Sequence, residues 1–422
     1  MLLLALVMVG ALGYHMRAHV VGRRRGTEAP RGVRAGARTG TKARRGMAVA
    51  CAAALAATAY VVLARARGRA ETLQGTFTDG GGHTMAMEDR RGEDGPTRKA
   101  RDTAGGWVEH ARKAGKMGAF VGVFTSFVDS PPKRDSFARR AALRKTWFPP
   151  DESALRDWLA QHNVAVRFVL GRQKPGSSST LERRVEDEQE EHGSFLRIPH
   201  DEDYLALPHK TLAFLTAVTT LFADDPPAYV VKIDDDVYVN LARVPEAVRQ
   251  WREPAGPRAR GADYVSCLKT GRIMADPRLR WYEPQHALLG AGAYDGHPPP
   301  NEQMYFLHAW GSAYALSFRA AAAVAALAQD RQVPLRFLAN EDTTLGLWML
   351  AIDSRHLDDR RMCENVCSDT SVVVYDMPKC PGLCPPVDEA MLAMHMSDAC
   401  VRARAQGRLT VPRSPAYFEL PE

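Results

Sequence analysis

The sequence lacks the glycine-rich motifs with which many proteins bind nucleotide phosphates. It contains neither G-x-x-x-x-G-K-[ST] nor G-x-G-x-x-G after a strand, so the phosphate-cradling loops that these motifs encode are excluded. If the chain binds a nucleotide, a metal ion and side chains must hold the phosphates. Asn-x-Ser/Thr acceptors are also absent, so N-glycosylation offers no support for a secretory route.

Acidic residues are scarce at the start of the chain. The first 70 residues hold 13 Lys and Arg but one acid, Glu28, and carry a net charge of +12. Because the whole chain of 422 residues carries +7, the remainder carries −5. A basic balance confined to an N-terminal arm argues against nucleic acid as a partner of the folded part. With 45% hydrophobic residues, the chain can form one large α/β domain with appendages, or two or three domains.

Long apolar runs are few. Residues 47–64 form a nearly continuous apolar stretch of 18 residues, close to the roughly 20 that span a membrane. Basic residues crowd its upstream flank, which favours a cytosolic N-terminus. We interpret 47–64 as a transmembrane signal anchor of single-pass type II topology, and 1–46 as a basic cytosolic tail. Alternatively, this Ala-rich stretch does not insert, or the Arg-rich start is an organelle transit peptide.

Cysteine is sparse, with seven residues in the chain. Cys51 lies in the predicted anchor, and the other six are Cys267, Cys363, Cys367, Cys380, Cys384 and Cys400. An even number, mostly clustered near the C-terminus, suits disulfides in an oxidising lumen. A zinc site built from the two C-x3-C pairs is the alternative, but usual zinc spacing is tighter. We predict disulfides without assigning their connectivity.

Residues 65–116 are rich in glycine and charge, which indicates a flexible luminal stem. From 117 to 405, apolar β-forming runs alternate with helical patterns, which predicts an α/β sandwich with a mostly parallel central sheet. We expect strands over 119–125, 164–170, 195–198, 229–233 and 264–268, and helices over 136–147, 151–162, 181–192 and 210–222. The Pro- and Gly-rich stretch 272–303 predicts a lid or acceptor-binding loop, and 406–422 a C-terminal tail.

Three acids follow the apolar run Tyr229–Ile233 directly: Asp234, Asp235 and Asp236. Ligands of open α/β sheets bind outside the carboxyl ends of strands. Asp234 and Asp236 face the same way along an extended chain and can share one hard cation such as Mn²⁺ or Mg²⁺. An acidic surface turn is the alternative. A second acid pair, Glu341-Asp342, starts a predicted helix, where a carboxylate serves either as a cap or as an ionised base.

Ten blocks, in order from about Phe120 to Cys400, resemble glycosyltransferase family 31, the inverting β-1,3-galactosyl- and N-acetylglucosaminyltransferases. They include Arg140-x3-Arg144-Lys-Thr-Trp147, Val231-Lys-Ile-Asp-Asp-Asp-Val-Tyr-Val239, Arg280-Trp-Tyr-x-Pro284 and Asn340-Glu-Asp-x2-Leu-Gly346. The C-terminal blocks His356-Leu-Asp-Asp-Arg-Arg361 and Cys380-x3-Cys384 with His395-x4-Cys400 match the plant-type branch, such as the hydroxyproline O-galactosyltransferases.

The resemblance implies a GT-A type, Rossmann-like fold, a UDP-sugar donor, a divalent metal and a membrane enzyme of the Golgi apparatus, with the endoplasmic reticulum possible. It makes Asp236 the direct metal ligand and Asp234 a ligand of metal or ribose. Asp342 matches the general base that takes the proton of the acceptor hydroxyl. His395 matches a histidine that completes the metal shell, with His356 as the alternative.

Four positions are expected to contact the nucleotide: Arg144, Lys210, Asp234 and Asp235. Cations near phosphate are the expected complement, although Arg144 and Lys210 also suit ordinary helix surfaces. Trp281, Tyr282, Trp310 and Tyr314 could stack on sugar faces, while buried aromatics usually belong to the core. Trp310 departs from the small residue expected before Gly311, which leaves the acceptor geometry open.

The resemblance implies a metal-dependent, inverting transferase. It would move galactose from UDP-galactose to a glycan or glycoprotein acceptor, in β-1,3 or hydroxyproline O-linkage. UDP-GlcNAc as donor is the nearest alternative. A catalytically silent relative that acts as a folding partner is a second alternative, and a metal-dependent phosphohydrolase is a third.

Overall fold

The computed structural model describes residues 77–78, 84–85, 106–111, 116–130, 134–174, 176–177, 179–254, 260–285, 303–330, 334–377 and 379–406. The chain divides into two units, Met1–Arg91 and Gly92–Glu422. In the first unit, the structure describes an antiparallel pair of short strands, β1 (Phe77–Thr78) and β2 (Thr84–Met85).

Several predicted segments lie outside the described residues: the tail 1–46, the anchor 47–64 with Cys51, most of the stem, loop residues 286–302, and 407–422. In the ranges that the structure describes, no helix has the length and apolar character needed to cross a membrane.

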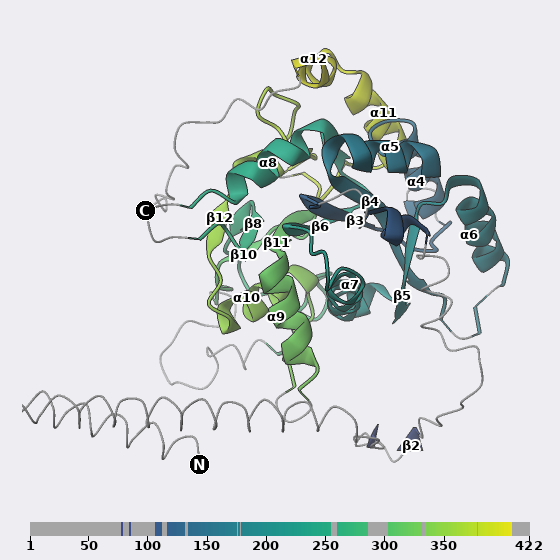
Figure 1. Ribbon diagram of the computed structural model, residues 1–422. Coiled ribbons are helices and arrows are strands. Elements are labelled where there is room, and N and C mark those ends of the chain that lie inside the picture. Colours follow the sequence, from purple (N-terminus) through teal and green to yellow (C-terminus); the bar gives the residue numbers. More distant parts are fainter. Residues whose placement is uncertain are drawn as a thin grey trace, which may run out of the picture. The chain divides into compact units, whose positions relative to one another are not determined.

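A seven-stranded sheet runs through the second unit (Figure 1), in the order β12-β8-β11-β6-β3-β4-β5. Its strands are β3 (Ala119–Phe124), β4 (Val164–Arg172), β5 (Phe195–Asp201), β6 (Tyr229–Asp234), β8 (Tyr264–Ser266), β11 (Ala313–Ser317) and β12 (His356–Asp358). All pairs are parallel except those of β11 with β6 and β8. The prediction of an α/β fold with a mostly parallel central sheet is confirmed.

Side chains alternate along each strand and pack into a separate hydrophobic core on each face of the sheet. On β3, Ala119, Val121 and Val123 join one core, whereas Phe120 and Phe124 join the other, as the two-residue period of a strand requires. The first core packs under α4 (Ser136–Arg144), α5 (Glu152–His162), α6 (Ser179–His192), α8 (Val244–Trp251), α11 (Val387–Met396) and α12 (Asp398–Gln406). The second packs against α7 (Leu207–Leu221), α9 (Phe318–Ala328) and α10 (Glu341–Ala351). Figure 1 shows these two sets on opposite sides of the sheet.

Local capping fixes the start of α4 and of α5, the two helices that connect β3 to β4. The Asp135 carboxylate accepts from Phe137 and Ala138 N–H and starts α4, and Asp151 starts α5 in the same way, as short acidic side chains do at N-caps. The predicted helix 136–147 ends earlier, at Arg144. The N–H groups of Thr146, Trp147 and Phe148 all turn back to one carbonyl, that of Leu143, so the regular ladder stops there.

Among the described residues, three disulfides are formed: Cys267–Cys363, Cys367–Cys400 and Cys380–Cys384. The first joins the C-terminal part to the residue that follows β8, and the other two link residues within the C-terminal part. The disulfide prediction is confirmed, and the four-cysteine zinc alternative is wrong because each cysteine of that set is already bonded. Cys267 also interrupts the predicted strand 264–268. Beyond it, β9 (Leu268–Lys269) leaves the main sheet and pairs with β10 (His308–Ala309).

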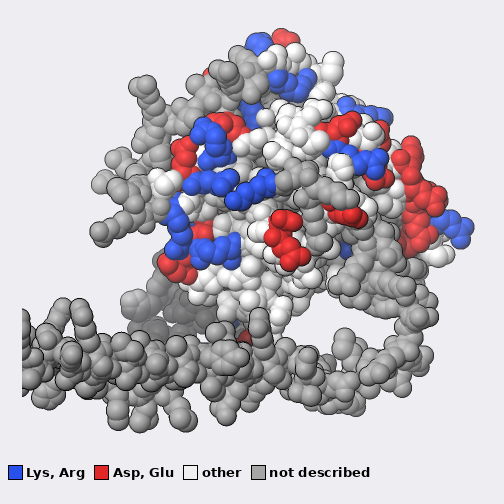
Figure 2. All heavy atoms as spheres, in the orientation of Figure 1, with Lys and Arg blue, Asp and Glu red and all other residues white. Residues whose placement is uncertain are grey.

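Charges of both signs are interspersed over the face seen in Figure 2, and the acids of α6 gather at its right edge. That helix buries Val185 alone. Most of its acidic run, Glu186, Asp187, Glu190 and Glu191, is a solvated helix face, whereas Glu188 is turned inward.

Candidate active site

The three-acid turn lies at the carboxyl end of β6, in the middle of the sheet. Asp235 is buried: one of its oxygens accepts from Thr125 Oγ1 at 2.7 Å and the other from Arg139 at 2.8 Å. Asp234 and Asp236 keep 36% and 23% of their side chains exposed. The turn therefore presents Asp234 and Asp236 outward and uses Asp235 to anchor itself. A nucleotide contact by Asp235 stays a prediction.

The outward pair carries more negative charge than its neighbours neutralise. Burial, followed by the charge of Asp234, raises the pKa of Asp236 to about 7, and Arg139, 3.6 Å away, offsets only part of this. Burial also raises the pKa of Asp234, against the opposing charge of Lys232. A divalent cation would relieve this repulsion. Mg²⁺ commonly takes one or two carboxylates, with phosphates completing its shell, so the residues present fit a hard cation.

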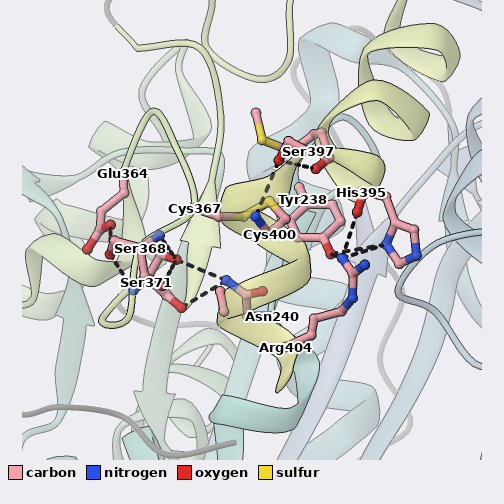
Figure 3. The surroundings of a disulfide bond; sticks show 12 residues. Tyr238, Asn240, Glu364, Cys367, Ser368, Ser371, His395, Ser397, Cys400 and Arg404 are labelled. Atoms are coloured by element: carbon pink, nitrogen blue, oxygen red, sulfur yellow. Dashed lines mark hydrogen bonds between the residues drawn. A yellow bond between two sulfur atoms is a disulfide. The ribbon is translucent and has the colours of Figure 1, made fainter. Parts of the chain in front are cut away.

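The histidines predicted to complete a metal shell have other partners in this structure. His395 Nδ1 lies 3.1 Å from Tyr238 Oη and 3.2 Å from Arg404, and Figure 3 shows this trio beside the Cys367–Cys400 disulfide. His356, on β12, contacts Ser354 and the ring of Tyr264. Across the described ranges, no three His, Cys, Asp or Glu side chains are grouped to hold a metal ion. The histidine ligand stays a prediction.

Asp342 occupies the first turn of α10, as the sequence predicted for this acid. Its Oδ2 lies 3.1 Å from Lys269 Nζ and 4.0 Å from His308 Nε2, and its Oδ1 accepts the N–H of Thr343 at 2.9 Å. Burial alone would raise the pKa of Asp342. The charges of Lys269 and His308, with these hydrogen bonds, outweigh burial and hold that pKa below its ordinary value. The carboxylate is therefore ionised at neutral pH and able to accept a proton.

A buried lysine links the two acidic centres. Lys232 Nζ lies 2.6 Å from Asp234 Oδ1 and 3.8 Å from Glu341 Oε2, and it donates to the carbonyl of Gly311. Burial alone would lower the pKa of Lys232, but Asp234 and Glu341 raise it. Glu341 is in turn held by Thr211 Oγ1 at 2.8 Å and by Tyr314 Oη at 2.6 Å. Ion pairs thus tie β6 to the start of α10.

The loop Trp310–Ser312 lies between Asp234 and Asp342. Its Ser312 carbonyl accepts the N–H of Asp234 at 2.9 Å. On the other side, a Cβ built at Gly311 would lie 3.5 Å from the Cβ of Asp342. Because one short loop touches both residues, the predicted metal ligand and the predicted base are neighbours in space, although 108 positions separate them in the sequence.

A C-terminal loop closed by the Cys380–Cys384 disulfide lies against the acid turn. Leu383 N–H donates to the Asp236 carbonyl at 2.6 Å, and Ser312 Oγ donates to the Pro381 carbonyl. A Cβ at Gly382 would come within 2.8 Å of the Asp236 carbonyl oxygen, so only glycine allows this approach. The disulfide loop thereby fixes the backbone of Asp236.

The two predicted phosphate-binding cations are turned toward protein partners. Arg144 pairs with Glu188 at 2.5 Å and donates to Ser194 Oγ at 2.8 Å. Lys210 is buried, pairs with Glu202 at 2.6 Å and donates to the Thr125 carbonyl. The α4 cation that reaches the acids is Arg139. Nucleotide contacts by Arg144 and Lys210 stay predictions.

Sequence reasoning missed four residues of this site: Arg139, Lys232, Lys269 and His308. One of them had a usable signal. Lys232 stands two positions before Asp234 on the same strand, so both must lie on one face. Lys269 and His308 meet through the β9–β10 pairing, which no local pattern predicted.

The pairing of Asp342 with Lys269 predicts how activity depends on pH if Asp342 is the predicted general base. A base acts while it is ionised, and the lowered pKa of Asp342 keeps it so well below neutral pH. Lys269→Gln removes the cation that lowers this pKa, and the effect of burial then raises it. We expect the acidic limb of kcat/KM against pH to move to higher pH, while Lys269→Arg keeps the limb near its original position. An unchanged limb in Lys269→Gln would show that Lys269 does not set the charge of the base.

The family described as Galactosyltransferase matches residues 138–360, which is more than half of the chain. The chain belongs to this family. Its sequence is 39% identical over 288 residues to the probable beta-1,3-galactosyltransferase 12 of Arabidopsis thaliana, covering 68% of each chain. It is 35% identical over 303 residues to the probable beta-1,3-galactosyltransferase 13 of the same plant, covering 72% of this chain and 78% of that relative.

These matches confirm the resemblance to the plant-type branch of glycosyltransferase family 31. As a family member, the protein is a hexosyltransferase of the galactosyltransferase type, and membership implies a nucleotide-sugar donor and a glycan acceptor. The matched segment contains both the acid turn and Asp342.

Proposed function

We propose that the protein transfers galactose from UDP-galactose, with inversion at the anomeric carbon, to a glycan or glycoprotein in β-1,3 or hydroxyproline O-linkage. We further propose that its sheet is the core of a GT-A type fold. One observation carries the proposal. An ionised carboxylate, Asp342, lies across a short loop from a pair of carboxylates, Asp234 and Asp236, that fit a diphosphate-bound cation.

The chemistry assigns each centre a separate task. Asp342 accepts the proton of the acceptor hydroxyl as that oxygen attacks the anomeric carbon and the bond to UDP breaks. A single displacement of this kind converts an α-linked donor into a β-linked product. Asp236 and Asp234 would hold Mn²⁺ or Mg²⁺, which supplies charge neutralisation for the departing diphosphate. Lys232 keeps Asp234 and Glu341, the neighbour of Asp342, at a fixed separation.

The proposal also includes a subcellular location. A type II membrane protein of the Golgi apparatus would carry this domain in the lumen. Three disulfides within the described residues support an oxidising compartment. The apolar stretch 47–64 with its basic upstream flank supports the anchor.

The test is donor turnover by the purified full-length protein. We expect UDP release from UDP-galactose in the presence of Mn²⁺, stimulation by a galactose-terminated acceptor, and loss of both with EDTA. Faster release of UDP from UDP-GlcNAc than from UDP-galactose would show that UDP-GlcNAc is the donor. The absence of turnover with any UDP-sugar, together with no thermal stabilisation by UDP and Mn²⁺, would reject the transferase and favour a silent folding partner.

A further inference from the structure

Two exposed aromatic side chains contact one arginine near the start of α10. Trp281 is 45% exposed, and Tyr204, in the short helix η2 (Tyr204–Ala206), is 53% exposed. The Arg280 guanidinium lies 5.1 Å from the ring centre of Tyr204 and 5.6 Å from that of Trp281, and its Nε donates to the Tyr204 hydroxyl at 3.1 Å. We call Tyr204, Arg280 and Trp281 the aromatic platform.

The platform is attached to the residues that position the base. Asn340, which precedes Glu341 and caps α10, donates from its side chain to the Trp281 carbonyl at 3.2 Å. On the other side, η2 leads directly into α7, whose Thr211 holds Glu341. The platform therefore joins the N-termini of α7 and α10, and Asp342 lies two residues from its Asn340 contact.

Burial singles out Trp281 among the aromatics that could face a sugar. The structure describes all seven tryptophans, and Trp281 alone is exposed while the other six are buried or half-buried. Tyr314 is buried and donates to Glu341, and the Trp310 ring is covered by Lys269 Nζ at 4.0 Å. An exposed indole contributes little to folding. The backbone carbonyl of Trp281 is bonded to Asn340, two residues before Asp342, so the exposure of this indole near the start of α10 points to a ligand.

We propose that the aromatic platform binds a pyranose ring of the acceptor glycan and thereby presents its hydroxyl to Asp342. This inference rests on the proposed transferase function and adds the acceptor subsite. A pyranose has one face of C–H groups, which packs on an indole as other apolar surfaces do. The guanidinium of Arg280, which lies over both rings, supplies N–H donors for ring hydroxyls. The platform takes no part in making or breaking bonds.

The first test is acceptor kinetics of the full-length protein with a β-linked galactobiose. Stacking of a sugar ring on an indole corresponds to about a tenfold effect on affinity. We therefore expect Trp281→Ala to raise the acceptor KM about tenfold with kcat little changed. Trp281→Phe, which keeps an aromatic face, should remain within about threefold. Leu350→Ala is the matched control, since Leu350 is a similarly exposed apolar residue, 52% exposed, near the far end of α10.

A second readout needs no turnover. Saturation-transfer NMR in the presence of UDP and Mn²⁺ should show galactobiose contacts with the original protein and Trp281→Phe but not with Trp281→Ala. The platform is rejected, with the transferase intact, if Trp281→Ala and Leu350→Ala have the same KM and the same NMR signals. Failure of the transferase itself is distinguishable, because UDP would then stabilise none of these proteins.

Discussion

Asp342→Asn is expected to abolish transfer while leaving the donor site intact. The amide has the size of the carboxylate but cannot accept the acceptor proton, and loss of a general base costs about 10²–10⁴-fold in rate. Asp342 makes no contact with the acid turn beyond the shared loop Trp310–Ser312, among the contacts of the described residues. Thermal stabilisation by UDP and Mn²⁺ should therefore match that of the original protein, as measured by a thermal-shift titration.

Asp388→Asn provides the matched control for this variant. Asp388 lies in the first turn of α11, so its replacement removes a comparable favourable charge from a helix N-terminus, about 0.3–1 kcal/mol, without touching the site. Near-normal transfer by Asp342→Asn would assign the base elsewhere. Loss of UDP binding in the same variant would show that Asp342 belongs to the donor site.

Asp236→Asn is expected to lose both transfer and metal-dependent UDP binding. Charge stabilisation by a bound metal contributes several kcal/mol to the transition state, so the rate should fall on the order of 10³-fold. Asp225→Asn, at an exposed position shortly before β6, is the control and should behave like the original protein. Retention of the Mn²⁺-dependent thermal shift in Asp236→Asn would place the cation on other residues.

Without metal, Asp236→Asn is also expected to change how the melting temperature depends on pH. The folded pKa of Asp236, about 7, is above its ordinary value of 3.8, so the neutral carboxyl is favoured in the folded state. The stability associated with that proton is complete below the ordinary pKa and is lost as pH rises through about 7. Metal-free Asp236→Asn should therefore unfold at a higher temperature than the original protein at pH 8, with a smaller difference at pH 5. A lower melting temperature at pH 8 would contradict the charge repulsion at the turn.

Local sequence patterns predicted the elements that carry the acids. The run Tyr229–Ile233 predicted a strand ending at the acid turn, and Asn340-Glu-Asp342 predicted a helix start; both are confirmed. These signals succeed because apolar β-formers and helix capping act over a few residues. Helix ends were predicted less accurately, as where the predicted helix 136–147 ends at Arg144, because a helix end depends on backbone hydrogen bonds that the hydrophobic pattern does not encode.

The partners of long cationic side chains were beyond the reach of such patterns. Arg139 and Arg144 lie on one helix, and the sequence favoured Arg144 as the cation beside the nucleotide. The structure directs Arg144 to Glu188 and Arg139 to the acid turn. That choice depends on how α4 packs against α6 and the end of β6. A buried charge needs a close partner, and only the folded chain decides which one is within reach.

By itself the sequence determined the family, the α/β sheet and the two acidic centres, since each depends on short blocks in a fixed order. Tertiary structure decided that Asp234 and Asp342 are neighbours, that Lys232 joins their elements and that Lys269 keeps Asp342 ionised. It also exposed Trp281 while burying Tyr314. The physical reason is common to all of these. Burial and charge pairing depend on distances between strands and helices that are remote in the chain, and those distances are set by how the sheet and its two helical layers pack.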